Sequence, residues 1–114
     1  METIERRYFE RFKARFPVRI QGSSHPFGET WLLRDASAEG ARIFSVTPLS
    51  LDQALTIQVQ LPYCKYALTL PSRVVWTKRV EPHIWDIGLK FRKTRLMSLA
   101  HLFKSAQYLY ESNR

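Results

Sequence analysis

The stretch ALTIQVQL, residues 54–61, alternates apolar and polar side chains from Leu55 onward. Its apolar positions are Leu55, Ile57, Val59 and Leu61. A period of two places these side chains on one face of a β-strand and the polar side chains on the other. The stretch IWDIGLKF, residues 84–91, repeats the pattern, with Trp85, Ile87, Leu89 and Phe91 on the apolar face. Both stretches predict half-buried strands that share one core.

Weaker strand patterns fill much of the remaining chain before residue 91. They cover residues 16–21, 30–34, 41–45 and 65–78. Pro71 lies inside the last of them and predicts a bend or bulge, since proline has no N–H to donate to a ladder. About six strands with short connections result, and closing them into an antiparallel barrel removes the edges that an open sheet would expose.

The period of the apolar residues changes after Thr94, a residue suited to cap the start of a helix. Apolar residues then recur at spacings of three and four, at Leu96, Leu99, Leu102, Phe103, Ala106, Leu109 and Tyr110. This spacing predicts an amphipathic helix. We therefore expect an all-β fold with a C-terminal helix, built on a six-stranded antiparallel β-barrel. One domain spans residues 1–114, with an arginine-containing segment at 1–14, the barrel at 15–92 and the helix at 94–112.

Size and charge bound the class of protein. The chain has 114 residues, of which 45% are hydrophobic, enough for one core without disulfides or metal. Its net charge of +8 is concentrated in two regions. Residues 1–20 carry six basic and three acidic side chains, and residues 73–95 carry seven basic and two acidic side chains. Such clusters attract anions, either phosphates or an acidic protein surface.

Several classes of site lack support in the sequence. No run of about 18 apolar residues exists, so we expect a soluble, cytoplasmic protein. The single Cys64 allows neither an internal disulfide nor a cysteine zinc cluster, and we expect it to be a small, partly buried strand residue. The histidines, His25, His83 and His101, are far apart and predict surface or helix positions rather than a metal site. No nucleophile elbow or glycine-rich phosphate loop is present, so we expect no catalytic residue, metal or cofactor.

The arginines near the N-terminus recur at every fourth position, at Arg7, Arg11, Arg15 and Arg19. Arg15 and Arg19 alternate with apolar residues, so we expect them on the outer face of the first strand. Arg7 and Arg11 precede that strand. A guanidinium fork can bind phosphate oxygens or the O6/N7 edge of guanine in a bidentate manner. The alternative is a solvated charged face without a ligand.

The stretch RDASAEGARI, residues 34–43, lies between two predicted strands. Asp35 can accept hydrogen bonds from the N1–H and N2–H₂ groups of guanine, and Ser37 can donate one to a phosphate. Gly40 allows a turn or a close approach of backbone to a ligand. In the alternative interpretation, Asp35 and Ser37 only satisfy backbone amides of a turn, and Gly40 supplies a positive φ.

Four segments together resemble a PilZ domain, the bacterial receptor module for the second messenger cyclic di-GMP. They are ERRYFERF (5–12), RDASAEGARI (34–43), VVWTK (74–78) and DIGLKF (86–91). The family pattern is Arg-x-x-x-Arg followed by Asp/Asn-x-Ser-x-x-Gly, and the chain matches it at Arg7, Arg11, Asp35, Ser37 and Gly40. The resemblance spans roughly residues 5–91 and implies a six-stranded barrel with a C-terminal helix.

The resemblance also implies how the ligand binds. Arg7 and Arg11 would clamp the phosphates and guanines of a cyclic di-GMP monomer or intercalated dimer, while Asp35, Ser37 and Gly40 would form the floor of the site. Further candidate contacts are Arg6, Arg34, Arg42, Arg73 and Trp76. The alternatives are solvent exposure for these arginines and a core position for Trp76.

We therefore expect a cyclic di-GMP receptor that orders its arginine segment on binding and signals to a separate effector protein. No fused output domain fits in 114 residues, and residues 78–95 or the exposed helix face are candidate docking surfaces. One alternative is a PilZ adaptor that acts through protein contacts without ligand. Another is a basic small barrel that binds RNA or single-stranded DNA, with Tyr8, Phe9 and Trp76 as stacking residues. A nucleotide-processing enzyme has the least support.

Overall fold

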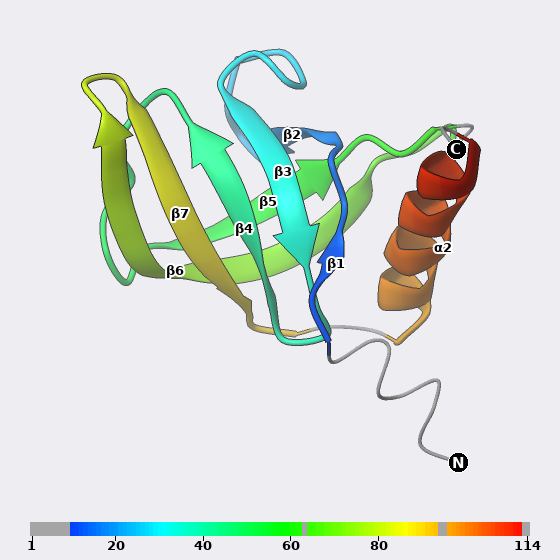
Figure 1. Ribbon diagram of the computed structural model, residues 1–114. Helices are drawn as coiled ribbons and strands as arrows, with labels where there is room; N and C mark the ends of the chain where they lie inside the picture. Colours follow the sequence, from blue (N-terminus) through cyan, green and yellow to red (C-terminus); the bar gives the residue numbers. More distant parts are fainter. Residues whose placement is uncertain (1–9, 63, 94–95, 113–114) are drawn as a thin grey trace.

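A computed structural model describes residues 10–62, 64–93 and 96–112 of the chain. The strands are β1 (Phe12–Lys13), β2 (Pro17–Ile20), β3 (Trp31–Ala36), β4 (Gly40–Ser45), β5 (Ala54–Val59), β6 (Leu68–Glu81) and β7 (Ile84–Phe91). The helix is α2 (Leu96–Ser112). Figure 1 shows the strands curving around one core while α2 stands beside them.

The strands close into an antiparallel barrel. Its order is β3-β2-β5-β6-β7-β4, and pairing between β3 and β4 completes the circle. The short strand β1 continues the line of β2 along β3, where Phe12 lies opposite Ala36. The fold class expected from the sequence, a six-stranded antiparallel barrel with a C-terminal helix, is confirmed.

The regular alternation of β5 and β7 builds the core as expected. Ile57 and Val59 of β5 and Ile87 of β7 are completely buried, and they pack in one cluster with the apolar residues of the other strands. β5 ends at Val59 rather than at Leu61, yet Leu61 remains buried. Half-buried Trp85 packs against the same core.

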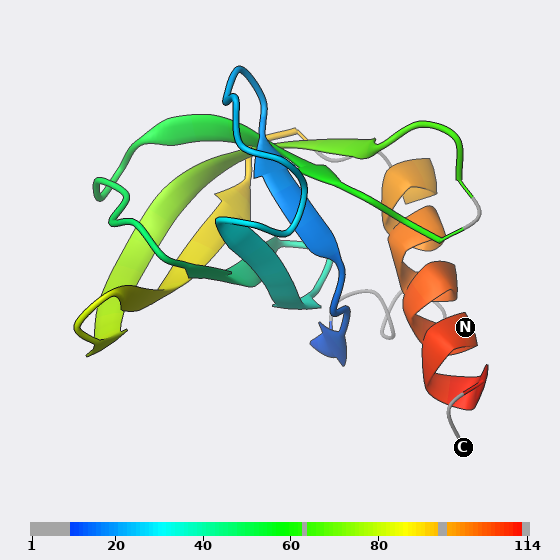
Figure 2. The same cartoon turned by 90° about the horizontal axis from the view of Figure 1, so that it is seen from above.

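The helix α2 covers one side of the barrel with the apolar face that its spacing predicts. Leu99, Leu102 and Ala106 are buried in the common core. The ring of Phe103 meets that of Phe12 in β1 edge to face, with 5.0 Å between centroids. In Figure 2, α2 (orange to red) and the turn between β6 and β7 (yellow-green) lie at opposite sides of the barrel. Thr94, the predicted helix cap, lies outside the described residues.

Two local expectations are wrong. Pro71 pairs in regular register with Thr56, without a bulge. The carbonyl of Pro71 accepts from the N–H of Arg92 at 2.9 Å, so the backbone polar groups of Pro71 face the residue after β7 and not β5. The missing N–H therefore removes no bond from the pairing with β5. Cys64 is exposed in the connection between β5 and β6 instead of being partly buried in a strand.

The histidines occupy the surface, as expected. His25, His83 and His101 are all exposed. Arg19 also follows the prediction of an outward position on the first strand of the barrel. Its guanidinium lies 4.4 Å from the ring centroid of Phe27 and donates a hydrogen bond to Gln58 Oε1 at 3.1 Å.

Candidate functional site

One row of residues crosses four strands on the outside of the barrel. Asp35 on β3 lies opposite Arg42 on β4, and Arg42 lies opposite Gly88 on β7. Gly88 in turn lies opposite Trp76 on β6. The row faces outward, because Ile43, the neighbour of Arg42 along β4, is completely buried. Figure 1 shows β3, β4 and β7 side by side at this surface.

A β-bulge at Arg34 turns Asp35 to the outside. Leu33 is buried, so strict alternation along β3 would also direct Asp35 into the core. Instead the register shifts between Leu33 and Asp35, which pair with adjacent residues of β4. A bulge adds one residue to one strand and re-aims the side chains that follow it. The bulge therefore places a carboxylate on the surface directly opposite Arg42.

A second bulge, at Val75 of β6, turns the side chain of Trp76 to the outside of the barrel. Val74 is buried, and the register of β6 shifts between Val74 and Trp76, with Val75 as the extra residue. Trp76 is consequently 41% exposed rather than buried. Its indole lies against Gly88, where a Cβ atom would overlap the ring. The glycine thus leaves room for an aromatic side chain that covers the strand from outside.

Two guanidinium forks hold the carboxylate of Asp35. Arg11 donates from Nε and Nη2 to Oδ1 at 2.9 and 2.6 Å. Arg42 donates from Nε and Nη2 to Oδ2 at 3.0 and 2.7 Å. Charge-assisted bonds of this kind are about twice as strong as neutral ones. The Asp35 side chain is 14% exposed, so both forks act at a half-buried, well-shielded acceptor.

The loop between β3 and β4 is a tight turn held by one backbone bond and one bond to a side chain. The N–H of Ser37 donates to the carbonyl of Gly40 at 2.8 Å, and the N–H of Glu39 donates to Ser37 Oγ at 3.2 Å. Gly40 does not have the positive φ of the turn interpretation. A Cβ at Gly40 would instead overlap the carbonyl of Leu89 on β7. The glycine is required by the close approach of two strands.

A polar pocket of about 260 Å³ lies beside this row. Its lining comprises Arg11, Ser37, Glu39, Gly40, Ala41, Val75, Trp76, Gly88, Leu89 and Lys90. The structure therefore brings together four of the residues singled out from the sequence, Arg11, Ser37, Gly40 and Trp76. Arg11 and Lys90 supply positive charge against the single carboxylate of Glu39, so the pocket suits a ligand with negative and aromatic parts.

The remaining predicted residues lie elsewhere. Arg34 pairs with Asp86 at 3.3 Å and stacks on the ring of Phe44, with 4.1 Å to the centroid. Arg73 donates to the carbonyl of Asp52 at 2.8 Å, away from the pocket lining. Arg6 and Arg7 lie outside the described residues.

Sequence reasoning missed six residues of the pocket lining, which are Glu39, Ala41, Val75, Gly88, Leu89 and Lys90. Gly88 and Lys90 occupy the polar face of the predicted strand 84–91, so their outward direction was visible in the alternation. Their proximity to the loop at residues 37–40 was not, because it depends on the pairing of β4 with β7, in which Gly40 lies opposite Lys90.

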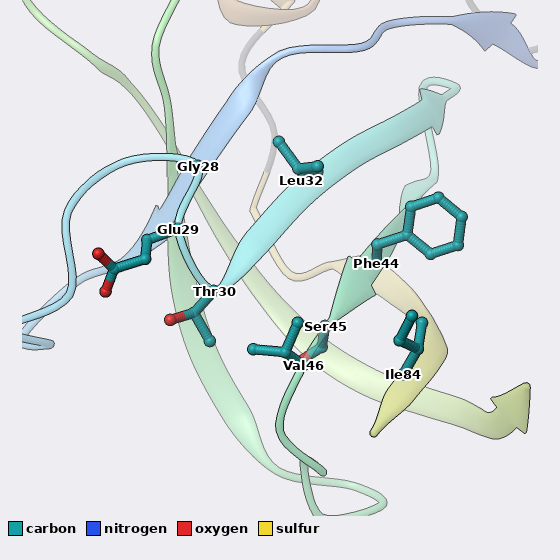
Figure 3. Close-up of a pocket in the computed structure, with 8 residues that line it drawn as sticks. All are labelled: Gly28, Glu29, Thr30, Leu32, Phe44, Ser45, Val46 and Ile84. Carbon is teal, nitrogen blue, oxygen red and sulfur yellow. The ribbon is translucent and has the colours of Figure 1, made fainter. Parts of the chain in front are cut away.

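A second pocket has a different chemistry. Figure 3 shows the side chains of Leu32, Phe44, Val46 and Ile84 around a pocket at the far ends of β3 and β4. The volume of this pocket is about 190 Å³. Glu29 is the one charged residue in its lining. This pocket contains none of the residues predicted for the site, and its apolar walls do not suit a phosphate.

Neither a metal site nor a membrane span is found in the described part of the chain. Residues 10–62, 64–93 and 96–112 contain no cluster of three or more side chains that could hold a metal ion. Over the same residues, no helix combines the length and the apolar character needed to cross a membrane.

Comparison with known proteins identifies the family. A search of curated proteins gave no match. The family model described as PilZ domain matches residues 5–108. This match covers nearly the whole chain, including both strands that carry the bulges and the loop at residues 37–40. The chain therefore belongs to the PilZ domain family, whose members are cyclic di-GMP receptors and binding modules.

Proposed function

We propose that this chain is itself a receptor for cyclic di-GMP, acting by binding and not by catalysis, in the bacterial cytoplasm. The observation that carries the proposal is the convergence of Arg11, Ser37, Gly40 and Trp76 on one polar pocket, with Asp35 next to it. These residues come from three separate stretches of the sequence, at residue 11, residues 35–40 and residue 76. Their meeting supports a site rather than a set of unrelated surface residues.

Each residue offers a group that the ligand needs. The guanidinium of Arg11 can bind a phosphate or the O6/N7 edge of a guanine. Asp35 can accept from the N1–H and N2–H₂ groups on the opposite edge. The exposed indole of Trp76 provides a face on which a base can stack. Ser37 and Gly40 line the same pocket, and we assign to them the floor of the site and the contact with a phosphate oxygen.

The size of the pocket supports the proposed ordering of the arginine segment. At about 260 Å³ it is smaller than the roughly 300–1,000 Å³ typical of complete ligand sites. A dinucleotide seated there extends beyond the lining, so additional groups are needed to cover it. We assign this role to the segment that carries Arg7 and Arg11, with Arg6 as a further phosphate contact, and ligand contacts drive its ordering.

We assign the output to a separate effector protein that reads the ligand-bound surface. Lys90, Arg92 and Lys93 are exposed at the end of β7, and Lys90 also lines the pocket. Ligand binding therefore changes the charge and shape of a surface that continues outside the site. The basic stretch at residues 78–95 supplies the docking surface in this proposal.

Isothermal titration of cyclic di-GMP into the purified protein tests the receptor function. We expect saturable binding that Arg11→Ala and Asp35→Ala abolish or weaken at least about 100-fold, in line with the loss of charge-assisted bonds. Arg73→Ala is the matched control, because Arg73 is a β6 arginine bonded outside the pocket. GTP should not compete.

Two outcomes would replace the proposal. A folded protein that takes up no cyclic di-GMP would be a ligand-independent adaptor. Tight, strongly salt-dependent binding of a single-stranded oligonucleotide, without preference for the dinucleotide, would favour the nucleic-acid interpretation.

A further inference from the structure

The two forks on Asp35 are chemically alike but differ in how firmly the fold holds them. Arg42 lies on β4 directly opposite Asp35, in the middle of a paired strand, and its side chain is 34% exposed. Arg11 precedes β1 and is 54% exposed. A partner fixed by cross-strand register loses little freedom when it pairs, whereas a partner on the segment before the first strand is easily exchanged.

The forks also divide the carboxylate between them. Both donors of Arg42 bind Oδ2, and both donors of Arg11 bind Oδ1. Each oxygen has two lone pairs in the carboxylate plane, so each fork saturates one oxygen. A guanine can therefore reach Asp35 only after one of the two arginines has released its oxygen.

We propose that Arg42 is a positioning residue that keeps hold of Oδ2 in both the free and the ligand-bound protein. Arg11 is the exchangeable partner, which releases Oδ1 to a guanine N–H and turns its own fork to the ligand. This inference rests on the proposed function and adds to it the residue that orients the carboxylate. It also predicts that Asp35 presents one oxygen, Oδ1, to the base.

The surroundings of Arg42 support a positioning role over direct ligand contact. Its Nε and Nη2 groups are both committed to Asp35, so neither is free to bind a ligand while this pair lasts. Without Arg42, the carboxylate can rotate away from the pocket or receive Arg11 on both oxygens. In either case the acceptor that distinguishes guanine is no longer held in place.

The test is the selectivity for cyclic di-GMP over cyclic di-AMP. It is measured by competition titration as the Kd of cyclic di-AMP divided by the Kd of cyclic di-GMP. Adenine presents an acceptor at N1 where guanine presents a donor, so a correctly held carboxylate rejects it. We expect Arg42→Gln and Arg42→Lys to reduce the ratio about tenfold, the low end of the discrimination that hydrogen bonds to a base edge provide. Lysine keeps the charge but lacks the fork.

Arg34→Gln is the matched control. Arg34 is the other outward arginine at this bulge, but it pairs with Asp86 and not with Asp35. Its loss should leave the ratio unchanged. If Arg42 acted only by attracting phosphates, Arg42→Gln would weaken both dinucleotides equally and Arg42→Lys would restore binding, and either result would overturn the inference.

A second measurement uses the unaltered protein, so it does not depend on how the variants fold. The Nε–H signals of Arg11 and Arg42 can be followed by NMR during titration with cyclic di-GMP. We expect the Arg11 signal to shift and the Arg42 signal to remain protected. Loss of the Arg42 signal on ligand addition contradicts the inference while leaving the receptor function intact, whereas absence of any binding removes both.

Discussion

Strands β5 and β3 belong to the same barrel, but their side chains follow different rules. Along β5 the alternation is unbroken, with Leu55, Ile57 and Val59 in the core and the residues between them toward solvent. Along β3 the bulge at Arg34 interrupts it and places Asp35 outside. The first arrangement stabilises the barrel, and the second interrupts a regular ladder to aim a functional group.

The same difference separates the two halves of β6. Its first half pairs regularly with β5, from Leu68 to Arg73. The second half begins with the bulge at Val75 and carries the exposed Trp76 against Gly88. Regular pairing therefore supplies the scaffold, while the two bulges supply the site. Substitutions in the two regions should consequently separate stability from binding.

The largest effect on stability is expected in the regular region. Ile57→Ala removes a completely buried side chain from the middle of β5 and leaves a cavity. We expect a loss of about 2–5 kcal/mol in the free energy of unfolding, measured by urea denaturation. The folded fraction should bind cyclic di-GMP with unchanged affinity. Weaker binding by fully folded Ile57→Ala protein would show that the scaffold and the site are not separate.

An intermediate effect is expected where the site meets the scaffold. Gly40→Ala introduces a Cβ that overlaps the Leu89 carbonyl, so β4 and β7 must move apart. We expect a loss of about 1–3 kcal/mol in the free energy of unfolding, by analogy with overpacked cores. Binding should weaken as well, because Gly40 lines the pocket. A Gly40→Ala variant with unchanged stability and affinity would refute the close-approach role.

The smallest effect on stability is expected where the exposed Trp76 of β6 covers Gly88 of β7. Gly88→Ala places a methyl group where the Trp76 indole lies, but the exposed indole can swing away. We expect less than about 1 kcal/mol of destabilisation and a tryptophan fluorescence spectrum shifted toward that of a solvated indole. Affinity for cyclic di-GMP should fall, because the stacking face is displaced. Trp76→Ala, which removes that face altogether, is the matched variant and should lower affinity at least as much.

Much of the fold was predictable from local patterns. The strands at 54–59 and 84–91 and the helix follow from periods of two and of three to four, because burial of an apolar face sets those periods. The bulge that was predicted at Pro71, and is absent there, shows the limit of this reasoning. Pro71 is tolerated in the regular pairing with β5 because its backbone polar groups face the other side, where its carbonyl bonds Arg92. The bulges at Arg34 and Val75 have no neighbouring proline or glycine that would indicate them.

The sequence by itself determined the family pattern, the barrel and the kinds of groups available for a ligand. These depend on residue identity and short spacing, which are local properties of the chain. Only the tertiary structure decided that Arg42 shares Asp35 with Arg11, that Trp76 is exposed, and that Lys90 joins the pocket. Each of these depends on the register between strands, and register is a long-range property because a shift of one residue reverses the face of every side chain beyond it.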